Sequence, residues 1–346
     1  MKRKRKMSKW IGIYVYIVLV FQFTNATAGS DSYKIKSLRG TWKLQIGDDT
    51  NWKNINYNDE DWDNVFVPSS WEDQGYHGYD GYAWYRKEFA ISEDYKNKSL
   101  VIKLGYIDDV DEVYINGQLI GYTGSFPPKY QTAYNASREY KIPKHLINYG
   151  GKNLIAVRVY DSEIQGGIVW GDVAIYVNPH PAPIDIDLEG IWKFHISDNL
   201  NWKDPYYQDD NWENIVVPGK WENQGYKEYD GYAWYRKKFK VPANYNYSRI
   251  VVLVGKIDDL DEVYLNGKLI NPIKKLGDEG RWVETNNEDW SMFRAFYIDG
   301  SILKANQMNT IAVRVYDGGG GGGIYEGPVG IIDQTEYVKY WRDKKK

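Results

Sequence analysis

The side chains best suited to chemistry in this sequence are carboxylates, and their densest run occurs twice. The run is IDDVDE at residues 107–112 and IDDLDE at residues 257–262. Paired carboxylates can cleave glycosidic bonds when they stand about 5–9.5 Å apart. We expect this run to lie on a strand, where successive side chains point to opposite faces. Its members are therefore not expected to act as one catalytic group.

Other signatures of catalysis are missing from the sequence. The chain has no cysteine, which excludes thiolate nucleophiles, thiolate metal sites and disulfides. It contains no G-x-S-x-G elbow and no D-x-D-x-D-G calcium loop. Four histidines lack a second histidine at metal-ligand spacing, namely His77, His145, His180 and His195. We expect no catalytic residue and no cofactor; a structural calcium ion stays open without a location, with the acidic segment 59–61 as one candidate.

The N-terminal segment is typical of a secretory signal peptide. Residues 1–10 carry six positive charges, residues 11–21 are apolar, and Ala-Thr-Ala follows at 26–28. The apolar run is too short to span a membrane, which takes about 20 residues. We expect cleavage before Gly29 and a secreted or periplasmic protein of a bacterial envelope. Removing six positive charges from a net charge of −3 leaves about −9, which argues against nucleic-acid binding.

A sequence repeat organises the chain. The phrase YDGYAWYRK occurs at residues 79–87 and, letter for letter, at residues 229–237. The phrase IAVRVYD occurs at residues 155–161 and 311–317, so the second repeat gains six residues before it. Two copies of one domain of ordinary size are expected. The predicted organisation is a signal peptide at 1–28, a first domain at 29–178, a proline-spaced linker at 179–189, a second domain at 190–332 and a charged tail at 333–346.

Each repeat is expected to fold as strands. In the repeated phrase, Tyr85 and Phe89 alternate with Trp84, Arg86 and Glu88, as in a strand with one buried face. An Asn-Gly pair at 116–117 between apolar residues predicts a tight hairpin. No long 3.6-residue apolar period with capping residues is present. The predicted fold class is all-β, with two tandem jelly-roll β-sandwich domains.

The repeat also separates structural from binding side chains. Aromatic residues that recur 150 positions apart are expected in the core, and they include Trp42 and Trp62. Arg86 recurs as well, and we expect it in a cross-strand charge ladder with Glu112 and Arg158. Trp170 has no counterpart and is free for specificity.

The ordered motifs resemble the galactose-binding-like sugar-binding domain of glycoside hydrolase family 2, the β-galactosidase-like group. The motifs are GxW, VxVPxxWExQG, YDGxxWYRKxF, IDDxDEVYxNGxLI, IAVRVYD and GGI, and they cover both repeats nearly end to end. The resemblance implies a jelly-roll fold and a carbohydrate ligand. The family's enzymes place their catalytic glutamates on a barrel of about 250 residues, and no stretch here alternates strands and helices over that length.

The resemblance also implies where a sugar would bind. In the family's enzymes, the loop before the YDG strand and the loop after the VRV strand reach toward the sugar. Aspartates there would accept hydrogen bonds from sugar hydroxyls, and aromatic rings would cover the apolar face of a sugar. The expected carbohydrate-binding residues are Trp71, Tyr79, Asp80, Tyr82, Asp161 and Trp170 in the first repeat, and Trp221, Tyr229, Asp230, Tyr232, Asp317 and Tyr325 in the second.

These observations favour a secreted, non-catalytic protein that binds oligosaccharides or polysaccharides through two repeated domains. Two sites on one chain can raise avidity about 10²–10⁴-fold. Three alternatives stay open: a glycoside hydrolase, an accessory subunit whose barrel lies on a separate glycosidase chain, and a surface structural module without a sugar ligand. The sequence does not specify the glycan, whether both repeats bind it, or the oligomeric state.

Overall fold

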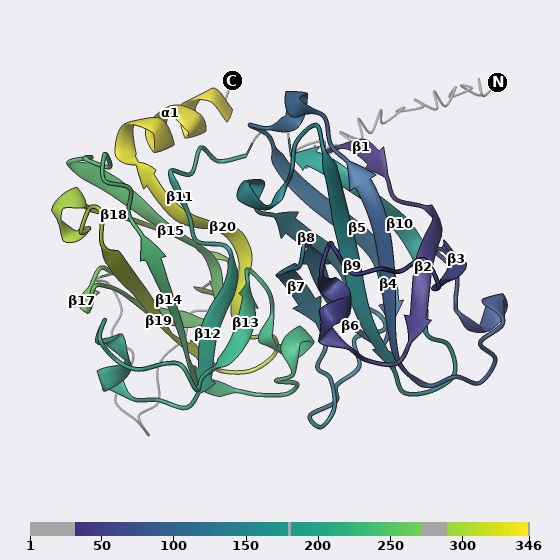
Figure 1. Ribbon diagram of the computed structural model, residues 1–346. Helices are drawn as coiled ribbons and strands as arrows, with labels where there is room; N and C mark the ends of the chain where they lie inside the picture. The colour runs from purple at the N-terminus through teal and green to yellow at the C-terminus, as the bar shows by residue number, and fades with distance from the viewer. Residues whose placement is uncertain (1–31, 179–180, 272–288, 345–346) are drawn as a thin grey trace, which may run out of the picture. The chain divides into compact units, whose positions relative to one another are not determined.

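A computed structural model describes residues 32–178, 181–271 and 289–344 of the chain (Figure 1). The predicted signal peptide lies outside the described residues. The four-stranded sheet of the first repeat has the order β1 (Tyr33–Ser37), β10 (Gly167–Asn178), β5 (Ser99–Asp108) and β8 (Ser137–Ile142). Its six-stranded sheet has the order β3 (Asp63–Val67), β2 (Gly40–Ile46), β4 (Gly81–Ala90), β9 (Lys152–Asp161), β6 (Val110–Ile115) and β7 (Gln118–Thr123).

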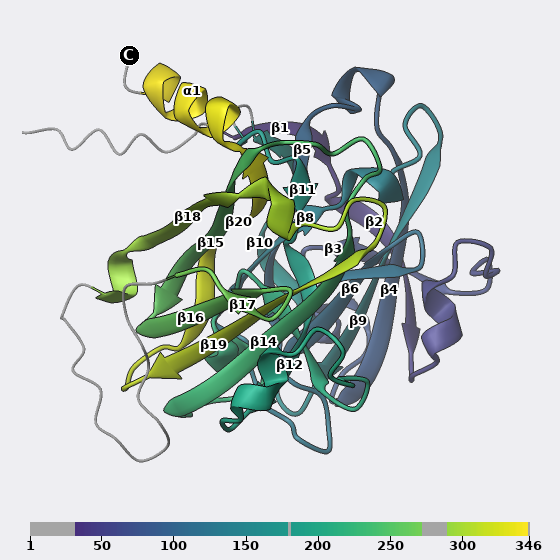
Figure 2. The same ribbon diagram turned by 90° about the vertical axis from the view of Figure 1, so that its left-hand side faces the viewer.

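The second repeat has the same pair of sheets, which Figure 2 shows as separate layers. The four-stranded sheet has the order β11 (Ile186–Asp187), β20 (Gly323–Asp333), β15 (Arg249–Asp258) and β18 (Phe293–Asp299). The six-stranded sheet has the order β13 (Glu213–Val217), β12 (Gly190–Ile196), β14 (Gly231–Lys240), β19 (Met308–Asp317), β16 (Leu260–Leu265) and β17 (Lys268–Leu269). All strand pairs in the four sheets are antiparallel.

Short 3₁₀ helices connect the strands. They are η1 (Thr50–Lys53), η2 (Glu72–Gln74), η3 (Glu93–Tyr95), η4 (Lys144–Leu146), η5 (Leu200–Lys203), η6 (Trp221–Gln224), η7 (Asp289–Ser291) and η8 (Gly300–Ile302). Among the described residues, no helix is long and apolar enough to cross a membrane.

The all-β prediction is confirmed, but the predicted architecture of two tandem jelly-roll sandwiches is wrong. The described strands are grouped instead in a propeller-like set of four sheets, two with four strands and two with six. A jelly roll divides eight strands between two sheets. Here the hairpins β2–β3 and β6–β7 each stay within one sheet, so that sheet grows to six strands while its companion keeps four. The hairpin at 116–117 itself lies where the Asn-Gly pair predicts it.

An apolar core lies between the two sheets of each repeat. In the first repeat, Tyr85 and Phe89 of β4 face this core together with Trp42, as the alternation predicts. Trp84 lies on the opposite face of β4, in a separate buried cluster with Trp62. These tryptophans are at most 6% exposed, which confirms the prediction that the shared tryptophans Trp42 and Trp62 are packing residues.

The outward face of β4 carries a buried ion pair that differs from the predicted charge ladder. Arg158 does bind Glu112 at 3.1 Å, but Arg86 binds Asp59 at 2.7 Å and donates to backbone carbonyls of the 52–57 loop. The prediction that Arg86 joins Glu112 and Arg158 is therefore wrong. Register explains the difference, because Arg86 lies opposite Ala156 and Arg158 lies opposite Trp84.

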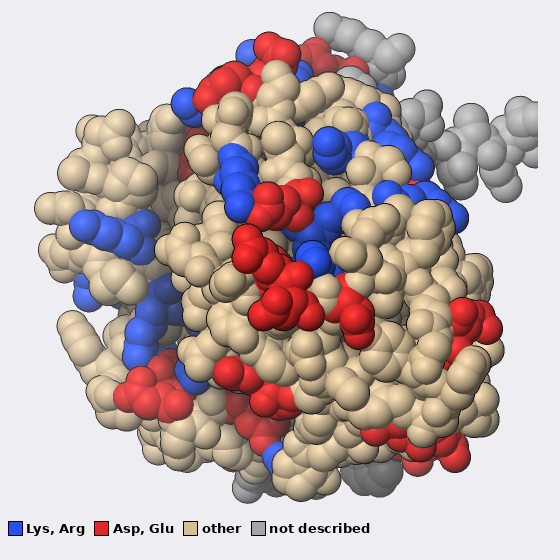
Figure 3. All heavy atoms as spheres, turned by 45° about the vertical axis from the view of Figure 1, so that its right-hand side comes forward, with Lys and Arg blue, Asp and Glu red and all other residues tan. Residues whose placement is uncertain are grey.

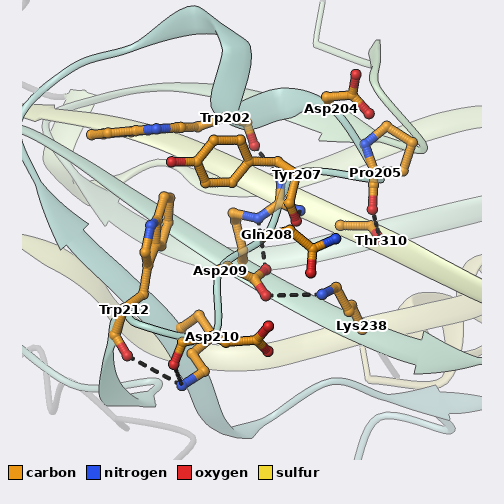
Figure 4. A network of polar contacts seen from close by, with 12 residues as sticks. Trp202, Asp204, Pro205, Tyr207, Gln208, Asp209, Asp210, Trp212, Lys238 and Thr310 are labelled. Carbon is orange, nitrogen blue, oxygen red and sulfur yellow. Dashed lines mark hydrogen bonds and ion pairs between the residues drawn. The ribbon is translucent and has the colours of Figure 1, made fainter.

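Figure 4 shows the equivalent network of the second repeat. Asp209 accepts hydrogen bonds from Arg236 Nε at 2.8 Å and from Lys238 Nζ at 2.9 Å, and Arg236 is fully buried. Both arginines tie a loop that contains a 3₁₀ helix to the sheet. Because the carboxylate of Asp59 is held by Arg86 in the same way, the acidic segment 59–61 is a poor place for calcium.

The predicted charged tail contains a helix that the sequence patterns missed. Helix α1 (Gln334–Lys344) follows β20, and the Asp333 side chain caps it by accepting hydrogen bonds from Thr335 N and Glu336 N. Tyr337 packs with Val251 and Ile332 on the outward face of the four-stranded sheet. Figure 2 shows the helix itself, coloured yellow. The aspartate with a glutamate three residues later is a capping signal that could have indicated this helix.

The two repeats touch through hydrogen bonds. The described residues of both repeats belong to one compact unit. Gly124 N donates to Asn223 O at 2.6 Å, and Gln131 Nε2 donates to Glu222 O at 2.6 Å. Because these contacts join the repeats, experiments on this protein should use the full chain.

We expect replacement of Trp42 by alanine to lower the free energy of unfolding by about 3–5 kcal/mol. Trp42 is 1% exposed, and its indole N–H donates to Leu38 O at 2.7 Å. Phe66→Ala is the matched control, because Phe66 is 56% exposed and its loss should cost about 0.5 kcal/mol or less. Denaturant unfolding of the full chain measures both; a Trp42→Ala variant as stable as the control would show that Trp42 is not a core residue.

Candidate functional site

Strand ends bring three carboxylates together in the first repeat. Strands β5 and β9 end at Asp108 and Asp161, which lie opposite the first residues of β10 and β4. Asp109 follows β5 directly. One oxygen from each of the three side chains lies within 4.8 Å of the others. We call Asp108, Asp109 and Asp161 the first acidic cluster.

Asp109 is the anchored member of this cluster. It is 6% exposed, and its Oδ2 accepts hydrogen bonds from Ser162 N and Ser162 Oγ at 3.1 Å each. The hydroxyl of Tyr130 also donates to Oδ2, and the hydroxyl of Thr132 donates to Oδ1. Burial raises the pKa of Asp109, but the hydrogen bonds from Thr132, Tyr130 and Ser162 outweigh it and hold the pKa below its ordinary value.

The other two members, Asp161 and Asp108, have fewer hydrogen-bond donors than Asp109. Asp161 is fully buried; its Oδ1 accepts from Glu163 N at 3.3 Å, and its Oδ2 has no hydrogen-bond donor among the residues that the structure describes. Burial raises the pKa of Asp161 to about 8, and the charges of Asp109 and Asp108 add to the rise. Burial, together with the hydrogen bond and charge of Asp109, raises the pKa of Asp108 to about 7.

The second repeat has an equivalent cluster of Asp258, Asp259 and Asp317, again with oxygens within 4.8 Å of one another. Asp317 is fully buried, and its Oδ2 likewise has no donor in the described part of the chain. Burial raises the pKa of Asp258 to about 7 and that of Asp317 to about 6. The positive charge of Lys220 opposes the rise at Asp258.

The loop after β9 is positioned by a tryptophan and a glutamate. Trp71 N donates to Gly166 O at 3.1 Å, and Gly166 N donates to Glu72 Oε2 at 3.1 Å. A Cβ on Gly166 would stand 2.0 Å from the Trp71 ring, and one on Gly167 would stand 2.2 Å from the Tyr85 hydroxyl. Only glycine therefore fits at these two positions.

The glycine run of the second repeat has the same constraint at its end. A Cβ on Gly322 would stand 2.0 Å from the Trp221 ring, and one on Gly323 would stand 2.6 Å from the Tyr235 hydroxyl. Gly322 N donates to Glu222 Oε1 at 2.8 Å. Two of the six glycines are thus required by packing against the side chains beneath them.

Several predicted binding residues turn out to support the loops. Trp71 and Trp221 are fully buried, so neither offers a stacking face to a ligand. Tyr79 is half-buried, and its hydroxyl donates to Tyr82 O at 2.7 Å. Tyr229 does the same to Tyr232 O at 2.6 Å. These contacts hold the YDG turn.

The structure separates Tyr82 from Asp161. Tyr82 lies on the outward face of β4, with the Arg158 guanidinium 4.9 Å from its ring centre and Tyr160 at 4.8 Å. In the second repeat, Tyr232 contacts Arg314 at 4.5 Å in the same way. Asp161 and Asp317 lie beneath the surface, fully buried, and leave no oxygen for a sugar to touch.

Three predicted residues keep exposed groups. Asp80 and Asp230 are exposed at the starts of β4 and β14. Trp170 on β10 is 58% exposed, and its ring stacks on that of Tyr106 on β5 with centroids 3.8 Å apart and planes 8° apart. We call this pair the aromatic platform. In the second repeat, Tyr325 is half-buried and donates its hydroxyl to Trp290 O at 2.7 Å.

The second repeat has no aromatic platform at the equivalent register. Tyr106 lies opposite Trp170 in the first repeat, and Lys256 lies opposite Glu326 in the second. Lys256 Nζ and Glu326 Oε2 form an ion pair at 2.7 Å. The same position on the two four-stranded sheets thus carries an aromatic stack in one repeat and two charges in the other.

Sequence reasoning missed the acidic clusters, although the repeated IDDxDE run was visible. The expected alternation fails because the run is not on one strand: β5 ends at Asp108 in one sheet and β6 begins at Val110 in the other. Asp111, inside β6, takes a different role and forms a fully buried ion pair with Arg138 at 2.7 Å.

The first acidic cluster is poorly placed for glycoside cleavage. Asp109 is 6% exposed and Asp161 is fully buried, so a glycosidic bond cannot reach these carboxyls. Figure 3 shows Lys and Arg side chains interspersed with Asp and Glu on the face it presents, without the continuous basic area that nucleic-acid binding needs.

We expect the stability of the metal-free chain to fall as pH rises from about 6 to about 8.5. The carboxyl of Asp161 has a pKa of about 8 when folded and about 3.9 when unfolded. The folded state therefore holds a proton that the unfolded state has released, so this contribution is complete below about pH 4 and is lost as pH rises through about 8. Asp161→Asn, which mimics the protonated form, should reduce the pH dependence.

Thermal melts in EDTA at the two pH values measure this effect. Asp73→Asn is the control, because Asp73 is exposed on η2. Each kcal/mol should move the melting temperature by about 2–4 °C. Equal pH dependence in the parent and in Asp161→Asn would contradict the assignment.

Comparison with known proteins finds relatives among glycosidases. Residues 47–164 match the family model described as the β-galactosidase second all-β domain. A β-glucuronidase of Formosa agariphila is 31% identical over 133 residues, which are 34% of this chain and 12% of that protein. A β-galactosidase of Thermoanaerobacter pseudethanolicus is 36% identical over 83 residues, which are 23% of this chain and 10% of that protein.

Solved structures give more distant likenesses. Bacteroides uniformis β-glucuronidase 2 matches with a TM-score of 0.36 and 14% identity, over 85% of this chain and 28% of that one. An uncultured Clostridium β-glucuronidase matches with a TM-score of 0.36 and 16% identity, over 78% of this chain and 39% of that one. The matched segments span about a tenth of the length of the β-glucuronidase and the β-galactosidase. The activities of those two proteins are therefore not assigned to this chain. Residues 47–164 carry a domain of the β-galactosidase type, and over this segment the chain is related to glycosidases.

Proposed function

We propose that this protein binds carbohydrate without cleaving it, and that the aromatic platform of Tyr106 and Trp170 is its principal contact with sugar. The main support is the exposed ring of Trp170, which stacks on the nearly parallel ring of Tyr106 with centroids 3.8 Å apart. The relatives are a β-glucuronidase and a β-galactosidase, and this supports carbohydrate as the ligand class.

The platform has the physical properties that sugar recognition requires. An indole ring offers a flat apolar area to the apolar face of a pyranose ring, and little side-chain entropy is lost when the ring is already stacked. Polar groups lie beside it: Lys34 Nζ binds Asp172 Oδ1 at 2.7 Å, and Arg39 donates to Gly171 O at 2.7 Å. Their remaining donors and lone pairs could exchange hydrogen bonds with sugar hydroxyls, and this supports the proposal.

The proposal assigns unequal roles to the two repeats. The exposed aspartates of the YDG turns, Asp80 and Asp230, are present in both. The platform exists only in the first repeat, since Lys256 and Glu326 occupy its place in the second. We therefore propose that the first repeat supplies most of the affinity and that the second contributes through Asp230 and Tyr325.

A glycoside hydrolase and an accessory subunit of a separate glycosidase chain are the competing functions. The burial of Asp109 and Asp161 argues against hydrolysis by the first acidic cluster, because a glycosidic bond cannot reach these carboxyls. Hydrolysis of aryl β-galactosides and aryl β-glucuronides by the purified chain, abolished by Asp108→Asn, would favour an enzyme instead.

We expect Trp170→Ala to weaken glycan binding by about ten-fold, which corresponds to about 1.4 kcal/mol. The full chain is first screened on a glycan array, and calorimetry then uses the glycan that binds most strongly. Phe66→Ala is the matched control, because Phe66 is 56% exposed in the same repeat and lies on β3 of the other sheet. Glu326→Ala tests the equivalent position of the second repeat and should leave the affinity within about two-fold.

Two outcomes would contradict the proposal. Absence of binding to every glycan on the array would favour a structural module without a sugar ligand. Equal affinities of the parent and Trp170→Ala would place the sugar site elsewhere on the chain.

We also propose that the protein is exported. The support is the sequence order of a basic head, a short apolar run and Ala-Thr-Ala at 26–28. Mass spectrometry of protein recovered from the periplasm or medium should show Gly29 as the first residue. An intact N-terminus in a membrane fraction would reverse the assignment.

A further inference from the structure

We propose that Asp108, Asp109 and Asp161 bind a hard divalent cation of the Ca²⁺ type, and that Asp258, Asp259 and Asp317 form a second, weaker site. The proposal is independent of carbohydrate binding, because the platform and the clusters are made of different residues. Three observations support it: a buried carboxylate oxygen without a hydrogen-bond partner, the negative charge around that oxygen, and the spacing and orientation of the three carboxylates.

The unpartnered oxygen is Oδ2 of Asp161. Its residue is fully buried, and no described residue donates a hydrogen bond to this atom. A buried carboxylate oxygen without a partner costs free energy, about 1–3 kcal/mol or more. A sugar cannot reach an atom that is closed to solvent, so only a proton, a water molecule or a small cation can satisfy it. The same orphan oxygen recurs on Asp317.

The charge around this oxygen favours a cation. Glu72 adds its negative field to Asp108, and Asp80 adds its field to Asp161. Arg138 is the cation that acts on Asp108, but its guanidinium is already engaged. Its Nε binds Asp111 at 2.7 Å, and its other nitrogens donate to the carbonyls of Ala133, Ala136 and Asp109. One shared proton can neutralise one carboxylate of the three, whereas a divalent ion balances two.

The ligands are also spaced and oriented for an ion. Ca²⁺ binds oxygen at about 2.3–2.6 Å, so two of its ligands stand up to about 5 Å apart. The 4.8 Å span of the cluster fits this limit. Asp109 is oriented by Tyr130, Ser162 and Thr132, as outer partners orient metal ligands elsewhere. Its Oδ1 accepts one hydrogen bond, from Thr132, and retains a lone pair for an ion.

The second site differs by one charge. Lys220 stands at the position that Ser70 occupies in the first repeat. A Cβ on Gly321 would lie 2.8 Å from Lys220 Nζ, so the ammonium rests on the glycine run that follows Asp317. Its charge acts on Asp258. A fixed ammonium there repels a metal ion, and this makes the second site the weaker one.

Calcium binding to the full chain tests the proposal. After EDTA treatment and dialysis, calorimetry with CaCl₂ should show binding with a Kd of about 1 mM or tighter, and Ca²⁺ should raise the melting temperature. Asp161→Asn should weaken the tighter site at least about ten-fold, a change of about 1.4 kcal/mol. Asp317→Asn should remove only the weaker site. Asp73→Asn, an exposed carboxylate on η2, should bind as the parent does.

The variant Lys220→Ser provides a second calcium-binding test that does not depend on an aspartate variant folding correctly. Lys220 is exposed, and its removal should tighten the weaker site, a gain that misfolding cannot produce. Absence of calcium binding with an unchanged melting temperature would mean that the orphan oxygen holds a proton or water, and would overturn the proposal. Parent-like binding by Asp161→Asn would overturn the location, and an unchanged or weaker site in Lys220→Ser would overturn the ranking.

Discussion

The convergence of like charges at the strand ends is the constraint around which each repeat is arranged. Strands β5 and β9 end beside the starts of β10 and β4, and this brings Asp108, Asp109 and Asp161 together. Charge repulsion and desolvation disfavour three ionised carboxylates at one place unless neighbouring groups compensate their charge. Hydroxyl and amide donors hold the pKa of Asp109 below its ordinary value, whereas Asp161 receives one amide hydrogen bond and keeps a raised pKa. A bound cation would compensate the negative charge of the other two carboxylates, Asp108 and Asp161.

The loop after β9, beside the first acidic cluster, has little room for other side chains. Trp71 lies flat against Gly166, and Gly167 faces the Tyr85 hydroxyl, so this loop cannot accept a side chain at either glycine. Glu72 fixes the same loop through the amide of Gly166. The repeated phrase YDGYAWYRK thus serves mainly to build this frame: its tyrosines and tryptophan pack, and its aspartate remains exposed.

The two repeats diverge where ligands would meet them. The first repeat has the stacked rings of Tyr106 and Trp170, whereas the second has the ion pair of Lys256 and Glu326. One shared frame therefore supports an apolar surface in one copy and a charged surface in the other. A duplicated domain that differs in this way can keep its stability while one copy specialises in recognition.

The sequence predicted local features well and long-range ones poorly. Alternation correctly assigned the core face of Tyr85 and Phe89, because that property depends on one strand. Trp71 was expected at a ligand because it lies in a loop, yet it is fully buried under that loop. The approach of Asp108 to Asp161 was missed because it depends on how the ends of two strands in different sheets meet. The propeller-like grouping and the uneven division of each repeat into sheets of six and four strands were missed as well, since pairing between distant segments leaves no periodic signal.

The most direct measurement of the central claim is a crystal structure of the full chain grown with CaCl₂, with anomalous diffraction used to identify the ion. The account predicts an anomalous peak at about 2.3–2.6 Å from Asp161 Oδ2 and from oxygens of Asp108 and Asp109. It also predicts lower occupancy of the equivalent position beside Asp317, where Lys220 stands. A well-ordered water molecule at Asp161 Oδ2, or a direct hydrogen bond between protonated Asp161 and Asp108, would contradict it.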